Sequence, residues 1–115
     1  MTMTKRIDYY QVCPEMITKL RGVTKDLEHC SLNPLLRALV ELRVSQVNGC
    51  AYCVDLHARE ARHRGETQQR LDSLPVWRES PFFTDREKAA FAWSESLTRI
   101  ADTHAADADY AARLP

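Results

Sequence analysis

The chain has 115 residues, of which 44% are hydrophobic and 28% are charged, with only three glycines and five prolines. This composition excludes a disordered or collagen-like chain, and at this length we expect residues 1–115 to form a single domain. The 16 basic and 16 acidic side chains balance, which argues against a nucleic-acid partner, because phosphate contacts need a local excess of Lys and Arg.

The predicted elements in the first half of the chain are helices, because apolar side chains recur at helical rather than strand spacing. A first helix follows Pro14, and its apolar face comprises Met16, Ile17, Leu20, Val23 and Leu27. Asn33 is expected to cap a second helix that begins at Pro34. The pair Asn48 and Gly49 is a stop signal that ends this helix.

The second half of the chain continues the pattern of caps and stops. We expect a third helix over residues 50–64, beginning at Cys50 or just after it and closed by Gly65. Thr67 is expected to cap a short fourth helix through Leu74, which Pro75 ends.

Thr84 and Glu87 have the spacing of a capping box, which predicts the start of a fifth helix. This helix is expected to carry Ala90, Trp93, Leu97, Ile100 and Ala101. For the segment 107–114 the sequence predicts no more than a short helical turn. The fold class predicted from these elements is all-α.

The chain shows no sign of a membrane or secretory segment. No apolar run approaches the roughly 20 residues that cross a bilayer, and the first residues lack the apolar core of a signal peptide. We therefore expect a cytoplasmic protein with no membrane partner. The four cysteines are too few and too clustered for the framework of a secreted domain, so Cys50 and Cys53 indicate redox or metal chemistry.

Cys50, Cys53 and His57 lie close together at the expected start of the third helix. Free amides and the macrodipole at a helix N-terminus stabilise a thiolate, which is the nucleophilic form of cysteine. His57 follows Cys53 by about one helical turn, so its imidazole can take up the thiol proton. Cys53 is nearer His57 and is the expected attacking thiolate, and Cys50 would resolve the sulfenic acid by forming a disulfide. We expect Asp55 and Glu60 on the exposed side of the same helix.

Two other interpretations of these residues stay open. The cysteines can be small buried apolar residues, with His57 a packed core histidine. A zinc site could use Cys50, Cys53 and His57 as three ligands, although no second C-x-x-C or H-x-x-x-H pair accompanies the first. Its fourth ligand would be His29, Cys30 or His63. We expect no metal and no cofactor.

The motif Asn48-Gly49-Cys50-x-x-Cys53-x-x-x-His57 resembles the alkylhydroperoxidase D / carboxymuconolactone decarboxylase family, and most closely its small single-domain branch. The similarity extends over residues 42–47, 60–62, 77–84 and 89–97. The resemblance implies an all-helical fold that assembles as a homotrimer or homohexamer. It also implies a thiol peroxidase site in which Cys53 attacks the peroxide and Cys50 resolves.

The chain departs from the family pattern in three respects. In better-understood members a glutamate twelve residues before the first cysteine joins the histidine in a proton relay, and here that position is Ala38. Glu41, which points about 60° away from the Ala38 direction on the same predicted helix, either replaces it through a water or leaves the relay missing. Tyr52 stands where alkylhydroperoxidase D itself has a histidine. Relatives continue into further helices, so we expect either missing C-terminal helices or a core layer supplied by a partner subunit.

These observations favour a cofactor-free thiol antioxidant that reduces hydrogen peroxide or a small organic hydroperoxide. Cys53 and Cys50 would be the redox pair, His57 the proton carrier and Glu41 a conditional relay group, with a dithiol reductant or reductase as partner. The alternative, motivated by Ala38, is a non-catalytic or redox-sensing helical oligomer. A lactone decarboxylase ranks last, because decarboxylation needs no redox cysteines.

Overall fold

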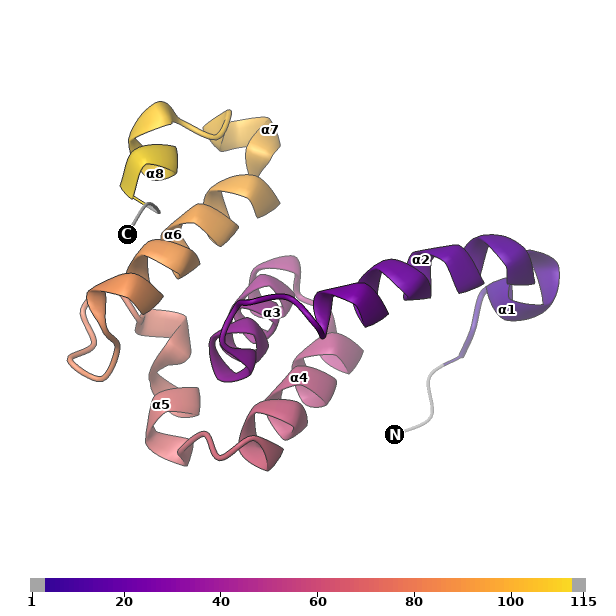
Figure 1. The fold of residues 1–115 in the computed structure, drawn as a ribbon, viewed down its shortest axis with the longest axis horizontal. Helices are drawn as coiled ribbons and strands as arrows, with labels where there is room; N and C mark the ends of the chain where they lie inside the picture. Colours follow the sequence, from indigo (N-terminus) through magenta and orange to yellow (C-terminus); the bar gives the residue numbers. More distant parts are fainter. Residues whose placement is uncertain (1–3, 113–115) are drawn as a thin grey trace. The chain divides into compact units, whose positions relative to one another are not determined.

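A computed structural model describes residues 4–112, and every regular element in that part of the chain is a helix (Figure 1). The predicted all-α fold is confirmed. In chain order the helices are α1 (Tyr9–Val12), α2 (Pro14–Leu27), α3 (Pro34–Asn48), α4 (Ala51–His63), α5 (Gln68–Ser73), the 3-10 helix η1 (Leu74–Val76), α6 (Asp85–Thr98), α7 (Ile100–Thr103) and α8 (Asp107–Ala112). The chain divides into two compact units between Ser31 and Leu32. The single domain over residues 1–115 stays a prediction.

The first unit contains α1, which the sequence did not predict, and α2, which it did. Asp8 caps α1 by accepting a hydrogen bond from the Gln11 N–H at 3.4 Å. No residue of α1 or α2 is buried. Within the first unit, nothing covers the apolar face predicted for α2, and Leu20 and Val23 are each 60% exposed.

The second unit is built around α3, which packs against α4 and α6 (Figure 1). Asn33 caps α3 as predicted, its Oδ1 accepting hydrogen bonds from the N–H groups of Leu35 at 2.8 Å and Leu36 at 3.3 Å. The largest fully buried side chains are Phe91, Leu39, Leu42 and Leu74. One face of α3 thus lies at the centre of the core. The C-terminal end of α3 leads into the segment that carries the two cysteines.

The predicted capping box at the start of α6 is present. The Thr84 hydroxyl accepts a hydrogen bond from the Glu87 N–H at 3.2 Å, and the Glu87 carboxylate accepts one from the Thr84 N–H at 2.9 Å. The Glu87 carboxylate also binds the Arg70 guanidinium. This contact ties the start of α6 to α5.

Three predicted boundaries were wrong. The fourth helix ends at Ser73, and Pro75 lies inside η1 rather than after the helix. The fifth helix does not run through Ile100, because Arg99 (φ −104°, ψ 33°) leaves the helical region between α6 and α7. Residues Asp107–Ala112 form a helix of six residues rather than a turn; the predicted end of that segment at Leu114 lies outside the described residues.

A buried carboxylate, Glu95, links α3, α6 and the segment after η1. Its Oε1 accepts hydrogen bonds from Arg43 Nε at 2.7 Å and Trp77 Nε1 at 2.9 Å, and its Oε2 accepts one from Arg78 Nη1 at 3.1 Å. Burial alone would raise the pKa of Glu95, but the hydrogen bonds from Trp77 and Arg43 outweigh it and hold that pKa below the ordinary 4.5. Glu95 is therefore ionised at neutral pH.

Candidate active site

The two cysteines of the motif form a disulfide at the start of α4, with their Cα atoms 5.3 Å apart. Gly49 makes this possible, because its φ of 66° ends α3 in the left-handed region that glycine adopts at little cost. Cys50 then caps α4, and its Sγ accepts a hydrogen bond from the Cys53 N–H at 3.2 Å. The predicted pairing of the two cysteines at a helix N-terminus is present.

The sulfurs of the pair have different positions relative to α4. Cys50 Sγ lies at the N-cap, where the helix dipole and the Cys53 amide both stabilise negative charge. Cys53 lies within the first turn of the helix. In the dithiol form, the N-cap position favours the thiolate of Cys50.

His57 lies between two carboxylates. Its Nδ1 is 2.8 Å from Glu60 Oε2 and 3.4 Å from Glu41 Oε2. Glu60 belongs to the same helix, whereas Glu41 comes from α3 and lies 3.7 Å from Arg37 Nε. The side chains of His57, Glu41 and Glu60 are 23%, 34% and 44% exposed. Both carboxylates meet the same ring nitrogen, which leaves Nε2 as the nitrogen that they do not engage.

The structure changes two expectations about these carboxylates. Glu60 was expected on the exposed side of α4, but it contacts His57, because residues three apart on a helix are neighbours. The spacing His57-x-x-Glu60 is the sequence signal that could have identified it. Glu41 lies in direct contact range of His57 rather than one water away. Ala38 is 2% exposed and belongs to the hydrophobic core.

A metal has two conceivable ligand sets here. The zinc set considered as an alternative needs Cys50 and Cys53 as thiolates, and the disulfide occupies both sulfurs. The side chains of Glu41, His57 and Glu60 place three potential ligand atoms within 4.8 Å of one another. An imidazole ring held between two carboxylates accounts for this cluster without an ion.

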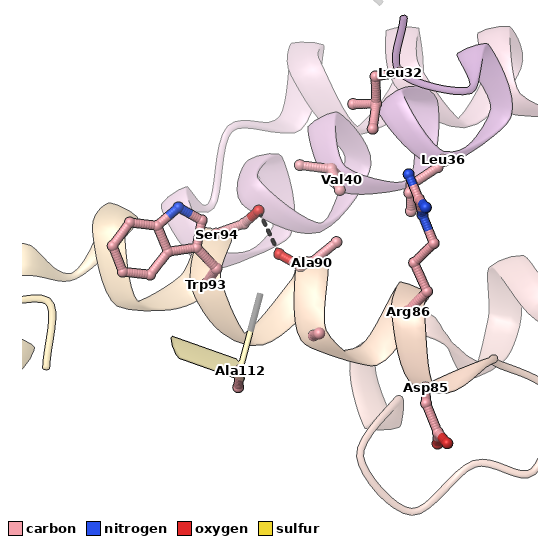
Figure 2. Close-up of a pocket in the computed structure, with 10 residues that line it drawn as sticks. Leu32, Leu36, Val40, Asp85, Arg86, Ala90, Trp93, Ser94 and Ala112 are labelled. Carbon is pink, nitrogen blue, oxygen red and sulfur yellow. Dashed lines mark hydrogen bonds between the residues drawn. The ribbon is translucent and has the colours of Figure 1, made fainter. Parts of the chain in front are cut away.

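An apolar cavity of about 530 Å³ lies elsewhere in the second unit, between α3, α6 and Ala112 (Figure 2). Its walls include Leu36, Val40 and Trp93, and its charged lining residues are Asp85 and Arg86. The Ser94 hydroxyl on its wall already donates to the Ala90 carbonyl at 2.7 Å. Because neither the cysteines nor His57 line it, the cavity is separate from the candidate site.

The model of the carboxymuconolactone decarboxylase family matches residues 14–96, a range that includes both cysteines, His57, Glu41 and Glu60. The chain belongs to this family. No helix in the described part of this family member is both long and apolar enough to cross a membrane.

Two relatives of this family member share sequence with it. The uncharacterized protein YdfG of Bacillus subtilis (strain 168) is 40% identical over 108 residues, which cover 94% of this chain and 74% of YdfG. The uncharacterized protein YnjA of Escherichia coli (strain K12) is 34% identical over 67 residues, or 58% of this chain and 37% of YnjA.

A solved structure shares the fold. The Agrobacterium tumefaciens protein ATU0492, of unknown function and provisionally described as an antioxidant defence protein AhpD, superposes with a TM-score of 0.90 at 35% identity. The match covers 96% of this chain and 75% of that chain. The expected alkylhydroperoxidase D-like fold is confirmed.

Proposed function

We propose that this chain is a thiol-dependent antioxidant enzyme that reduces hydrogen peroxide or a small organic hydroperoxide by cycling Cys50 and Cys53 between dithiol and disulfide. The observation that carries the proposal is the Cys50–Cys53 disulfide at the N-terminus of α4. Such a position favours the thiolate form, and the geometry already accommodates the oxidised state of the cycle. The reductant is a dithiol or a reductase, and the expected compartment is the cytoplasm.

In the first step the Cys53 thiolate attacks one peroxide oxygen, so that an S–O bond forms and the O–O bond breaks. The leaving hydroxide or alkoxide takes a proton from the His57 imidazolium and departs as water or an alcohol. Glu41 supports the charged form of the ring. Cys53 is now a sulfenic acid, oxidised by two electrons.

In the second step the Cys50 thiolate attacks the Cys53 sulfur, forming the disulfide and releasing hydroxide, which is protonated to water. The N-cap position suits this role, because a resolving cysteine must also attack as a thiolate. A dithiol then reduces the disulfide through a mixed disulfide and is itself oxidised.

Peroxide consumption with excess dithiol tests the proposal. We expect Cys53→Ser to abolish turnover, Cys50→Ser to trap a sulfenic acid, and His57→Ala to slow the rate about 100-fold. Cys30→Ser is the matched control, because Cys30 is a free, exposed cysteine, and it should leave the rate unchanged. If the parent protein with dithiol consumed peroxide no faster than the dithiol alone, the proposed enzymatic activity would be refuted.

The second candidate function is a redox-sensing oligomer without turnover, which the buried Ala38 at the family's relay position favours. It predicts that the disulfide forms and is reduced reversibly while peroxide consumption stays at the background rate. For either function we propose assembly as a homotrimer or homohexamer, supported by the resemblance to the family and by the exposed apolar face of α2.

A further inference from the structure

We propose that Glu60 is a positioning residue, which holds the His57 ring with its proton on Nδ1 so that Nε2 is the base that accepts and returns the thiol proton. This inference rests on the proposed function, because it identifies the group that orients the proton carrier. It was not expected from the sequence, which placed Glu60 on the solvent side of its helix.

The distances distinguish the two carboxylates. Glu60 Oε2 lies 2.8 Å from Nδ1, a good hydrogen-bond length, whereas Glu41 Oε2 lies 3.4 Å away. The Glu60 contact is made within one turn of α4, so the helix backbone fixes the separation of the two side chains. Glu41 reaches His57 from another helix and also lies 3.7 Å from Arg37.

The charged groups that face His57 come from both helices that form the site. In the part of the chain that the structure describes, they are Glu60 from α4 and Glu41 from α3, with Arg37 beyond Glu41. Within the same part, the Glu60 carboxylate forms an ion pair with His57 and with no other residue.

The chemistry of the contact fixes the tautomer. An ionised carboxylate can only accept a hydrogen bond, so a neutral His57 ring that binds Glu60 through Nδ1 must carry its proton there. The lone pair is then on Nε2. When Nε2 takes a proton, the resulting imidazolium lies beside two carboxylates.

The same contacts place carboxylates beside His57 although the residue at position 38 is an alanine. Ala38, which stands where the resemblance implies a relay glutamate, is buried in the core side of α3. The charge next to the histidine comes instead from Glu60, on the same helix as the cysteines, and from Glu41 across the α3–α4 contact.

Two variants of Glu60 separate orientation from charge. Glu60→Gln keeps an acceptor oxygen but removes the charge, whereas Glu60→Ala removes both. Asp55→Asn is the charge-matched control on the same helix, because Asp55 pairs with Arg59 at 3.1 Å and is exposed. Circular dichroism checks that each variant keeps its helices, and alanine at position 60 suits a helix.

Nitrogen NMR of the His57 ring, measured on the disulfide form, reports the tautomer without requiring turnover. We expect the parent ring to be protonated at Nδ1. Glu60→Gln should keep this tautomer, because its amide oxygen can still accept a hydrogen bond from Nδ1. Glu60→Ala should shift the neutral ring toward the Nε2–H tautomer, and Asp55→Asn should resemble the parent.

The peroxide rate completes the test. If the proposed function holds, the rate should fall about tenfold in Glu60→Ala, with a changed pH profile, and should fall less in Glu60→Gln. Parent-like NMR of the ring in Glu60→Ala would overturn the role of Glu60, whatever the rates. An inactive parent whose ring still responds to Glu60 would overturn the proposed function but not the Glu60–His57 contact.

Discussion

Gly49 is the residue on which the geometry of the cysteine pair depends. Its φ of 66° allows α3 to end at Asn48, so that Gly49 alone separates α3 from Cys50, the N-cap of α4. A Cβ at this position would meet nothing within 4 Å. The cost of a side chain there is therefore backbone strain rather than a steric clash with a neighbour.

We expect Gly49→Ala to lower the free energy of unfolding by about 1 kcal/mol, because alanine resists the left-handed conformation. Urea unfolding followed by circular dichroism measures the change. Gly22→Ala is the matched contrast: Gly22 lies inside α2, has no positive φ and also has open space around it. That substitution should increase helix content, since alanine is favoured by about 1 kcal/mol in a helix interior. A Gly49→Ala protein as stable as the parent would contradict the strain argument.

At the level of the elements, the start of α6 is fixed by hydrogen bonds that the sequence encodes locally. Thr84→Ala removes one bond of the capping box and should lower the free energy of unfolding by about 1 kcal/mol. Thr98→Ala, at the other end of α6, is the control, because its hydroxyl only donates to the Ser94 carbonyl at 2.7 Å. It should change stability by less than about 0.5 kcal/mol. If the two variants lost the same free energy of unfolding, the stabilising role of the capping box would be contradicted.

The sequence predicts elements well where the signal is a cap. Asn33 before Pro34, Gly49 after α3 and the Thr84–Glu87 pair all act within four residues, and each was found where expected. The break between α6 and α7 has no such signal, because Arg99 is neither a glycine nor a proline, and only its backbone angles reveal it.

The same distinction applies to the candidate site. Cys50, Cys53 and His57 belong to one short segment, so their proximity follows from helix geometry alone. The contact between Glu41 and His57 joins α3 to α4 and depends on how the two helices pack. The helical spacing of His57 and Glu60 was enough to predict their contact. The charged residues around Glu60 favoured a solvent-exposed face of the helix instead.

For the whole molecule, ionised carboxylates predict how stability depends on pH. Burial opposes ionisation of Glu95 and Glu87, but hydrogen bonds from Trp77 and Arg43 to Glu95, and from Arg70 and Thr84 to Glu87, hold both pKa values below the ordinary 4.5. In the unfolded chain both groups return toward that value. Their contribution is therefore present above pH 4.5 and is lost as the pH falls through the folded-state pKa values.

We expect the free energy of unfolding to change little between about pH 7 and pH 5.5 and to fall steadily from about pH 5 to pH 3. Urea titrations across this range measure it. Glu95→Gln should be less stable than the parent at pH 7 by about 3 kcal/mol, because Arg43 and Trp77 lose an ionised acceptor, and its stability should depend less on pH. Glu79→Gln is the control, because it also removes one carboxylate but at another position. Its free energy of unfolding should depend on pH as that of the parent does. Stability that rises on acidification would contradict this account.

Self-association is the second property of the whole molecule that the surface predicts. The first unit buries none of the residues of α1 or α2, and Met16, Leu20 and Val23 are 55%, 60% and 60% exposed. Soluble monomers rarely expose a contiguous apolar stripe of this kind, because covering apolar surface is worth roughly 25 cal/mol per Å². A second copy of the chain brings the same stripe and can cover it.

If the chain assembles as the homotrimer or homohexamer proposed above, light scattering should give a mass three or six times the 13.2 kDa of one chain. Replacing Leu20 and Val23 together by glutamine should lower that mass, because the stripe loses apolar area while α2 keeps its helical composition. The control is Val76→Gln: Val76 is also exposed, at 62%, but lies in η1 and outside the stripe. A monomeric parent protein would contradict self-association through the apolar stripe of α2. An oligomer that tolerates the double substitution would place the interface on the second unit instead.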